Sequence, residues 1–145
     1  REPASPILSK ELVVRILLVG VMLLVGAFGL FYWSLEQGLP LNEARTVAVN
    51  MFVFGELFYL FNCRSLSKSL LEIRFFSNPW LLTGVLSMIV LQLLFTYQPL
   101  MNELFQSAPI GVTAWIYLIS FSMIIHLAVE VVKWIYRPVK KDKCN

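Results

Sequence analysis

Long apolar runs alternate with short polar connections along this chain. Four runs are long enough to cross a membrane, at about residues 13–33, 47–62, 80–97 and 112–135. The hydrocarbon core of a bilayer is about 30 Å thick and an α-helix rises about 1.5 Å per residue, so one crossing needs about 20 apolar residues. We therefore predict an all-α, polytopic membrane protein in which residues 1–145 form a bundle of four transmembrane helices.

Proline and aromatic residues mark the ends of these runs. Proline disrupts the interior of a helix but is tolerated in its first turn, and aromatic rings with a polar tip favour the membrane–water interface. We expect all seven prolines to lie in connections or at helix edges. They are Pro3, Pro6, Pro40, Pro79, Pro99, Pro109 and Pro138. The aromatic residues near the ends of the runs are Tyr32, Trp33, Trp80, Tyr97, Trp115, Trp134 and Tyr136.

The composition supports a membrane protein and excludes an ordinary soluble domain. Hydrophobic residues make up 58% of the sequence and charged residues 14%, compared with roughly 45–50% and 25% in soluble proteins. The basic residues form no stripe along one face, so the formal charge of +3 does not indicate a nucleic-acid partner. Cys63 and Cys144 show no spacing typical of a disulfide framework or a metal site, and we expect two free thiols. The expected surroundings are lipid.

The cationic residues are distributed unevenly between the two sides of the predicted bundle. Eleven of the twelve Lys and Arg residues lie in the two terminal flanks and in the connection between the second and third runs. The other two connections contain Arg45 together with Glu36, Glu43 and Glu103. Because cationic residues are retained on the cytosolic side, we predict that both termini face the cytosol, in a plasma or inner membrane. The eleven are Arg1, Lys10, Arg15, Arg64, Lys68, Arg74, Lys133, Arg137, Lys140, Lys141 and Lys143.

Glu56 is the most informative candidate for function. It lies inside the second run, where an unpaired carboxylate costs several kcal/mol, so we expect it to be buried against protein rather than to face lipid. Gly55 beside it would let another helix come close. Two interpretations remain open: an ion or proton site, or a carboxyl group that only joins helices by hydrogen bonds. At 100° per residue, the face of Glu56 also carries Arg45, Val49, Phe52, Tyr59 and Cys63.

The chain cannot complete a cation site by itself. Hard cations bind oxygen, and calcium takes about 6–8 oxygen ligands. Tyr59 and Asn62 are the candidates for a supporting shell around Glu56, while Ser and Thr in such helices mostly bond to their own backbone. If Glu56 binds a cation, the remaining ligands must come from other helices.

A second candidate, His126, could form a proton relay with Glu130 and Lys133, but we expect it to have a structural role. Glu130 and Lys133 are spaced as an i, i+3 ion pair, which leaves His126 as an interhelical hydrogen-bond donor. No phosphate-binding glycine loop or hydrolase motif is present in the sequence. We therefore expect this chain to be no enzyme by itself, with neither catalytic residues nor a cofactor site. It begins with Arg1 rather than methionine, and we expect it to be part of a longer protein.

Several stretches of the sequence carry a resemblance to a known family. They are residues 6–9 (PILS), 43–50 (EARTVAVN), 55–65 (GELFYLFNCRS), 78–82 (NPWLL) and 129–137 (VEVVKWIYR). Through them the whole chain resembles the C-terminal transmembrane region of P-type cation-transporting ATPases of the calcium-pump-like group. The first stretch resembles the connection into the seventh membrane helix, the next two the eighth helix, and the last two the start of the ninth and the end of the tenth.

This resemblance implies a role for the chain inside a larger pump. In the calcium pumps, the glutamate that matches Glu56 contributes to a transported-ion site. The parent pump would use ATP and Mg and transport a cation, with its other transmembrane and cytosolic domains as partners of this chain. The four helices would then be the steadier group that anchors the moving transport helices. The alternative is an independent four-helix accessory or regulatory membrane protein, in which Glu56 only joins helices.

Overall fold

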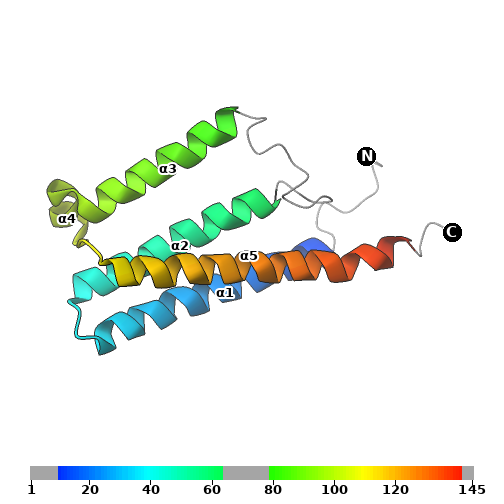
Figure 1. Ribbon diagram of the computed structural model, residues 1–145, viewed down its shortest axis with the longest axis horizontal. Coiled ribbons are helices and arrows are strands. Elements are labelled where there is room, and N and C mark those ends of the chain that lie inside the picture. Colours follow the sequence, from blue (N-terminus) through cyan, green and yellow to red (C-terminus); the bar gives the residue numbers. More distant parts are fainter. Residues whose placement is uncertain (1–9, 64–78, 142–145) are drawn as a thin grey trace.

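The structure, a computed structural model, describes residues 10–63 and 79–141, without the side chains of residues 11, 62–63 and 136–141. Its helices are α1 (Lys10–Glu36), α2 (Leu41–Cys63), α3 (Pro79–Tyr97), α4 (Pro99–Phe105) and α5 (Val112–Lys141) (Figure 1). In these ranges α1, α2, α3 and α5 are long and apolar enough to cross a membrane. The predicted all-α class and the four transmembrane helices are confirmed.

The helices extend beyond the apolar runs that revealed them. The second run was predicted to start near residue 47, whereas α2 begins at Leu41, directly after Pro40, whose carbonyl oxygen accepts a hydrogen bond from Ala44 N at 3.0 Å. Polar residues of the first turns continue the helix because backbone hydrogen bonding does not require apolar side chains. At the other end of the chain, Pro138 lies near the end of α5, in keeping with an edge position.

The short helix α4 was not predicted. It begins with Pro99 after the extended residue Gln98, and it ends at Phe105, directly before Gln106, whose φ of 52° is in the left-handed region. Proline suits the first position of a helix because the missing N–H would have no partner there. With seven residues, α4 is too short for the apolar-run criterion to detect.

The core of the molecule lies between α1, α2 and α5. Buried apolar side chains recur every three or four residues along α1 and at spacings of four and seven residues along α5, which places them on one face of each helix. The α1–α2 and α2–α5 pairs make the most extensive helix–helix contacts of the described residues. The core residues are Val19, Leu23, Ala27, Leu30, Val47, Met51, Ile110, Ala114, Leu118, Ile125 and Val129.

Helix α3 stands apart from this three-helix core and is joined to it near one end (Figure 1). The buried Asn50 of α2 donates its amide hydrogens to Thr96 Oγ1 of α3 at 3.0 Å and to Thr46 O at 2.9 Å. One turn away, Thr46 Oγ1 accepts a hydrogen bond from Ala108 N at 2.9 Å. These bonds attach α3 and the segment after α4 to α2 near the end of the bundle where α4 lies.

The long helices run antiparallel to their neighbours in sequence. Figure 1 shows the start of α1, the end of α2, the start of α3 and the end of α5 at one end of the bundle, and α4 at the other. Below, the end of the bundle where α4 lies is called the α4 end, and the other end is called the opposite end. The arrangement is the one that four successive membrane crossings require. That the opposite end faces the cytosol stays a prediction.

Candidate cation site

Helix α2 has one buried stripe and one exposed stripe. Side chains of the first stripe pack against α1 and α5, whereas those of the second point away from the core, each stripe following the helical spacing of three or four residues. The buried stripe consists of Ala44, Val47, Met51 and Gly55. The exposed stripe, called the open face of α2 below, consists of Arg45, Val49, Phe52 and Glu56.

Glu56 is exposed on this open face. Among the residues that the structure describes, its carboxylate has no hydrogen-bond or ion-pair partner. The apolar span of α2 runs from Leu41 to Phe61, and Glu56 lies about 7.5 Å along the axis from Phe61, at about 1.5 Å per residue. Within the described residues Glu56 is not buried, because α1 and α5 pack on the other side of α2. Its predicted burial against protein would require other helices and stays a prediction.

The position next to Glu56 allows α1 and α2 to approach closely, as predicted from Gly55. Gly55 is buried, and a Cβ atom at this position would overlap Cδ2 of Leu23 in α1. The two helices therefore touch where α2 has no side chain. This contact directs the next residue, Glu56, away from α1.

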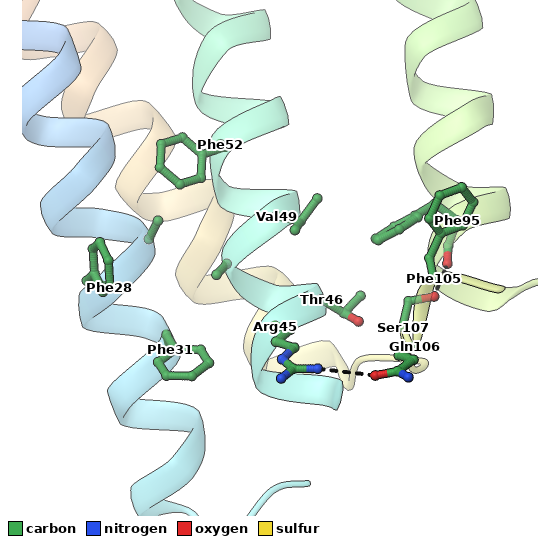
Figure 2. Close-up of a pocket in the computed structure, with 12 residues that line it drawn as sticks. Phe28, Phe31, Arg45, Thr46, Val49, Phe52, Phe95, Phe105, Gln106 and Ser107 are labelled. Carbon is green, nitrogen blue, oxygen red and sulfur yellow. Dashed lines mark hydrogen bonds between the residues drawn. The ribbon is translucent and has the colours of Figure 1, made fainter. Parts of the chain in front are cut away.

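An apolar groove of about 360 Å³ runs along the open face from the α4 end. In Figure 2, Phe28 and Phe31 of α1 lie on one side of it, and Phe95 and Phe105 lie on the other. Val49 and Phe52 of α2 lie between these walls, and Arg45 Nη1 donates to Gln106 Oε1 at 3.4 Å near the α4 end. Glu56 follows Phe52 by about one helical turn, farther from the α4 end.

Of the two predicted supporting residues of Glu56, the structure describes the side chain of Tyr59. Tyr59 is half-buried and packs against the hydrophobic core. The side chain of Asn62 lies outside the described residues, as do those of Cys63 and Cys144, the predicted free thiols. The supporting role of Tyr59 and Asn62 therefore stays a prediction.

Two predictions for the other polar residues of the apolar spans are confirmed, and one is not tested. Lys133 Nζ and Glu130 Oε1 form the predicted i, i+3 ion pair, with 3.1 Å between the two atoms. His126 is half-buried, and its predicted part as an interhelical donor stays a prediction. The expected bonds from hydroxyl groups to their own helix backbone, four residues back, are confirmed for Thr83, Ser87, Ser120 and Ser122.

The burial of four polar residues, Arg15, Asn50, Thr96 and Gln92, was not predicted. Arg15, predicted to be a flanking charge, is only 2% exposed, because it lies four residues before Val19 on the core stripe of α1. The Asn50–Thr96 bond was not predicted. The amide nitrogen of Gln92, one turn from Thr96, is buried and has no hydrogen-bond partner in the described structure. Each of these side chains lies four residues from another buried position, and this spacing could have indicated that they are buried.

Comparison with known proteins shows the family to which this chain is similar. Residues 1–135 match the family described as "Cation transporting ATPase, C-terminus". The chain is 42% identical over 129 residues to a Mycobacterium tuberculosis protein named "Probable cation-transporting ATPase F", an alignment that covers 89% of this chain and 14% of that protein.

Two further relatives come from a cyanobacterium and from human. The chain is 33% identical to "Cation-transporting ATPase pma1" of Synechocystis, covering 79% of this chain and 13% of that protein. It is 27% identical to human "Calcium-transporting ATPase type 2C member 1", covering 93% of this chain and 15% of that protein. The chain thus spans about one seventh of the length of these relatives. It belongs to the C-terminal membrane region family of the P-type cation-transporting ATPases.

Proposed function

We propose that this chain is the C-terminal membrane module of an ATP-driven pump for calcium or a similar cation, and that Glu56 is one ligand of the transported ion. The single observation that carries the proposal is the exposed carboxylate of Glu56, which has no partner among the described residues and lies within an apolar span. Leaving such a group against lipid costs several kcal/mol. A site completed by other helices of the pump removes that cost.

The chemistry of Glu56 suits a hard cation. A carboxylate supplies one or two of the oxygen ligands that calcium prefers. Among the described residues, no three His, Cys, Asp or Glu side chains converge. The other ligands would therefore come from transport helices elsewhere in the pump, and the ATP and Mg sites from its cytosolic domains.

The groove beside Glu56 supports the second part of the role, which is to anchor the transport helices. Its walls are aromatic, and the α1–α2–α5 core supports it from behind. An apolar groove of this kind is suited to packing against another membrane helix. The independent accessory protein is not favoured, because the family and the relatives are cation-transporting ATPases.

The substitution Glu56→Gln in the complete pump tests the proposal. Gln keeps the size and one carbonyl oxygen but removes the charge. We expect the calcium concentration that gives half-maximal phosphorylation from ATP to rise about 10- to 100-fold. The midpoint temperature of unfolding in detergent should change little, because removing a costly buried charge need not destabilise a protein.

A matched variant, Glu103→Gln, removes the same charge from an exposed position in α4. It should leave the calcium requirement unchanged. If Glu56→Gln lowers the stability of the pump while the calcium requirement stays the same, Glu56 joins helices and is not a ligand.

A further inference from the structure

Gly55 and Glu56 are neighbours in sequence, but they lie on different faces of α2. Gly55 is buried against α1, and Glu56 is exposed on the open face. Successive residues of an α-helix are separated by about 100° around the axis. The rotation of α2 against α1 therefore determines the direction in which the Glu56 carboxylate points.

Two reciprocal glycine contacts set this rotation. A Cβ atom at position 55 would overlap Cδ2 of Leu23, and it would lie 3.7 Å from Leu23 Cγ and 3.8 Å from Met51 Cε. About one turn away, a Cβ atom at Gly26 of α1 would come within 3.0 Å of Met51 Cε. Each helix thus presents a glycine to a large side chain of the other helix, and small residues at such places let helix backbones approach closely.

Leu23 has little freedom to move aside. It is 6% exposed and belongs to the hydrophobic core between α1, α2 and α5. Packed interiors transmit a change of volume instead of absorbing it. A methyl group added at position 55 would therefore displace or rotate α2 in addition to moving the end of Leu23.

We propose that Gly55 is a positioning residue for cation binding, because its missing side chain lets Leu23 pack on α2 and so fixes the direction of Glu56. The inference rests on the proposed function, in which Glu56 is a ligand. Ligand distances in metal sites are held to about 0.2 Å. A shift of α2 large enough to relieve the overlap with Leu23 exceeds that tolerance.

The test measures the calcium concentration for half-maximal phosphorylation of the complete pump, together with its midpoint temperature of unfolding. We expect Gly55→Ala to raise the calcium requirement about tenfold, as loss of supporting residues does in other metal sites. Leu23→Phe enlarges the side chain that α1 contributes to the same contact, and it should also raise the calcium requirement. This second variant leaves α2 unchanged and serves if Gly55→Ala fails to fold.

Two controls separate positioning from general destabilisation. Gly84→Ala adds the same methyl group to α3, where nothing lies within 4 Å, and should leave the calcium requirement unchanged. Leu23→Ala combined with Gly55→Ala removes the overlap and should restore a requirement close to that of the unmodified pump. Leu23→Ala alone leaves a cavity and should lower the unfolding temperature.

The outcomes distinguish this inference from the function on which it rests. If Gly55→Ala and Leu23→Phe lower only the unfolding temperature while Glu56→Gln raises the calcium requirement, Gly55 has a merely structural role and the inference is wrong. If Glu56→Gln also leaves the requirement unchanged, the ligand role of Glu56 fails and the inference fails with it.

Discussion

At the scale of single residues, Asn50 shows how a polar side chain is accommodated inside an apolar bundle. It is fully buried, and its amide group bridges α2 and α3 by donating to Thr46 O and Thr96 Oγ1. The Thr96 hydroxyl in turn donates to Gln92 O at 2.8 Å. Each donor in this short series of hydrogen bonds has an acceptor. The hydrogen bonds therefore offset the cost of burying these polar side chains.

We predict a small but measurable coupling between Asn50 and Thr96. Interhelical hydrogen bonds in membrane proteins contribute about 0.6 kcal/mol on average and about 1.7 kcal/mol at most. A double-mutant cycle of Asn50→Leu and Thr96→Val, measured by unfolding in mixed micelles, should give a coupling energy in this range. Additive effects of the two substitutions would show that the bond contributes nothing.

The candidate site could be located from the sequence, but its direction could not. Glu56 is identifiable because a carboxylate within an apolar run is rare and costly. Its exposure depends on which face of α2 the neighbouring helices cover. Between Arg45 and Glu56, the open face carries Val49 and Phe52, which are as apolar as Val47 and Met51 of the buried stripe. These apolar residues do not indicate which face α1 and α5 cover.

At the scale of the helices, α3 differs from the others in how it is attached. Its buried residues are Val85, Gln92 and Thr96, and its hydrogen bonds to α2 lie near the α4 end. The rest of the helix presents apolar side chains to its surroundings. Segments with few buried contacts have low local stability. The isolated chain should therefore hold α3 firmly at the α4 end and loosely at the opposite end.

Paired spin labels on the isolated chain in detergent test this expectation. Labels at exposed positions 86 of α3 and 60 of α2 should give a broader distance distribution than labels at positions 93 and 49, which are nearer the α4 end. The native cysteines, Cys63 and Cys144, would be replaced by serine. Equally narrow distributions for the two pairs would mean that α3 is fixed along its whole length.

The four long helices were predictable because membrane thickness sets a minimum length for an apolar run. The short helix α4 was not, because a seven-residue helix depends on local chemistry at Pro99 and Gln106. The attachment of α3 to α2 through Thr96 could not be predicted from the sequence either. Pairing between polar groups on two helices follows from tertiary packing, which the periodicity of either helix does not specify.

At the scale of the whole molecule, the charge asymmetry predicts the orientation of the bundle. Described cationic residues at the opposite end include Lys10 and Lys133, whereas Glu36 and Glu103 lie toward the α4 end. We predict that the opposite end faces the cytosol.

Thiol labelling of intact cells with a membrane-impermeant reagent tests this orientation. Cysteines introduced in place of Gln37 and Leu104 should react, each in a chain without its native cysteines, whereas native Cys144 should be protected. Reaction of Cys144 with protection at positions 37 and 104 would reverse the topology.

The proposed role of Glu56 as a ligand of the transported cation can be tested without the catalytic cycle. Equilibrium binding of radioactive calcium to the complete pump in the absence of ATP reports on the site itself, because no later step of the cycle affects the result. We expect Glu56→Gln to weaken calcium binding by about 10- to 100-fold, whereas Glu103→Gln should leave it unchanged. Calcium binding of unaltered affinity and amount in a folded Glu56→Gln pump would show that Glu56 is not a ligand.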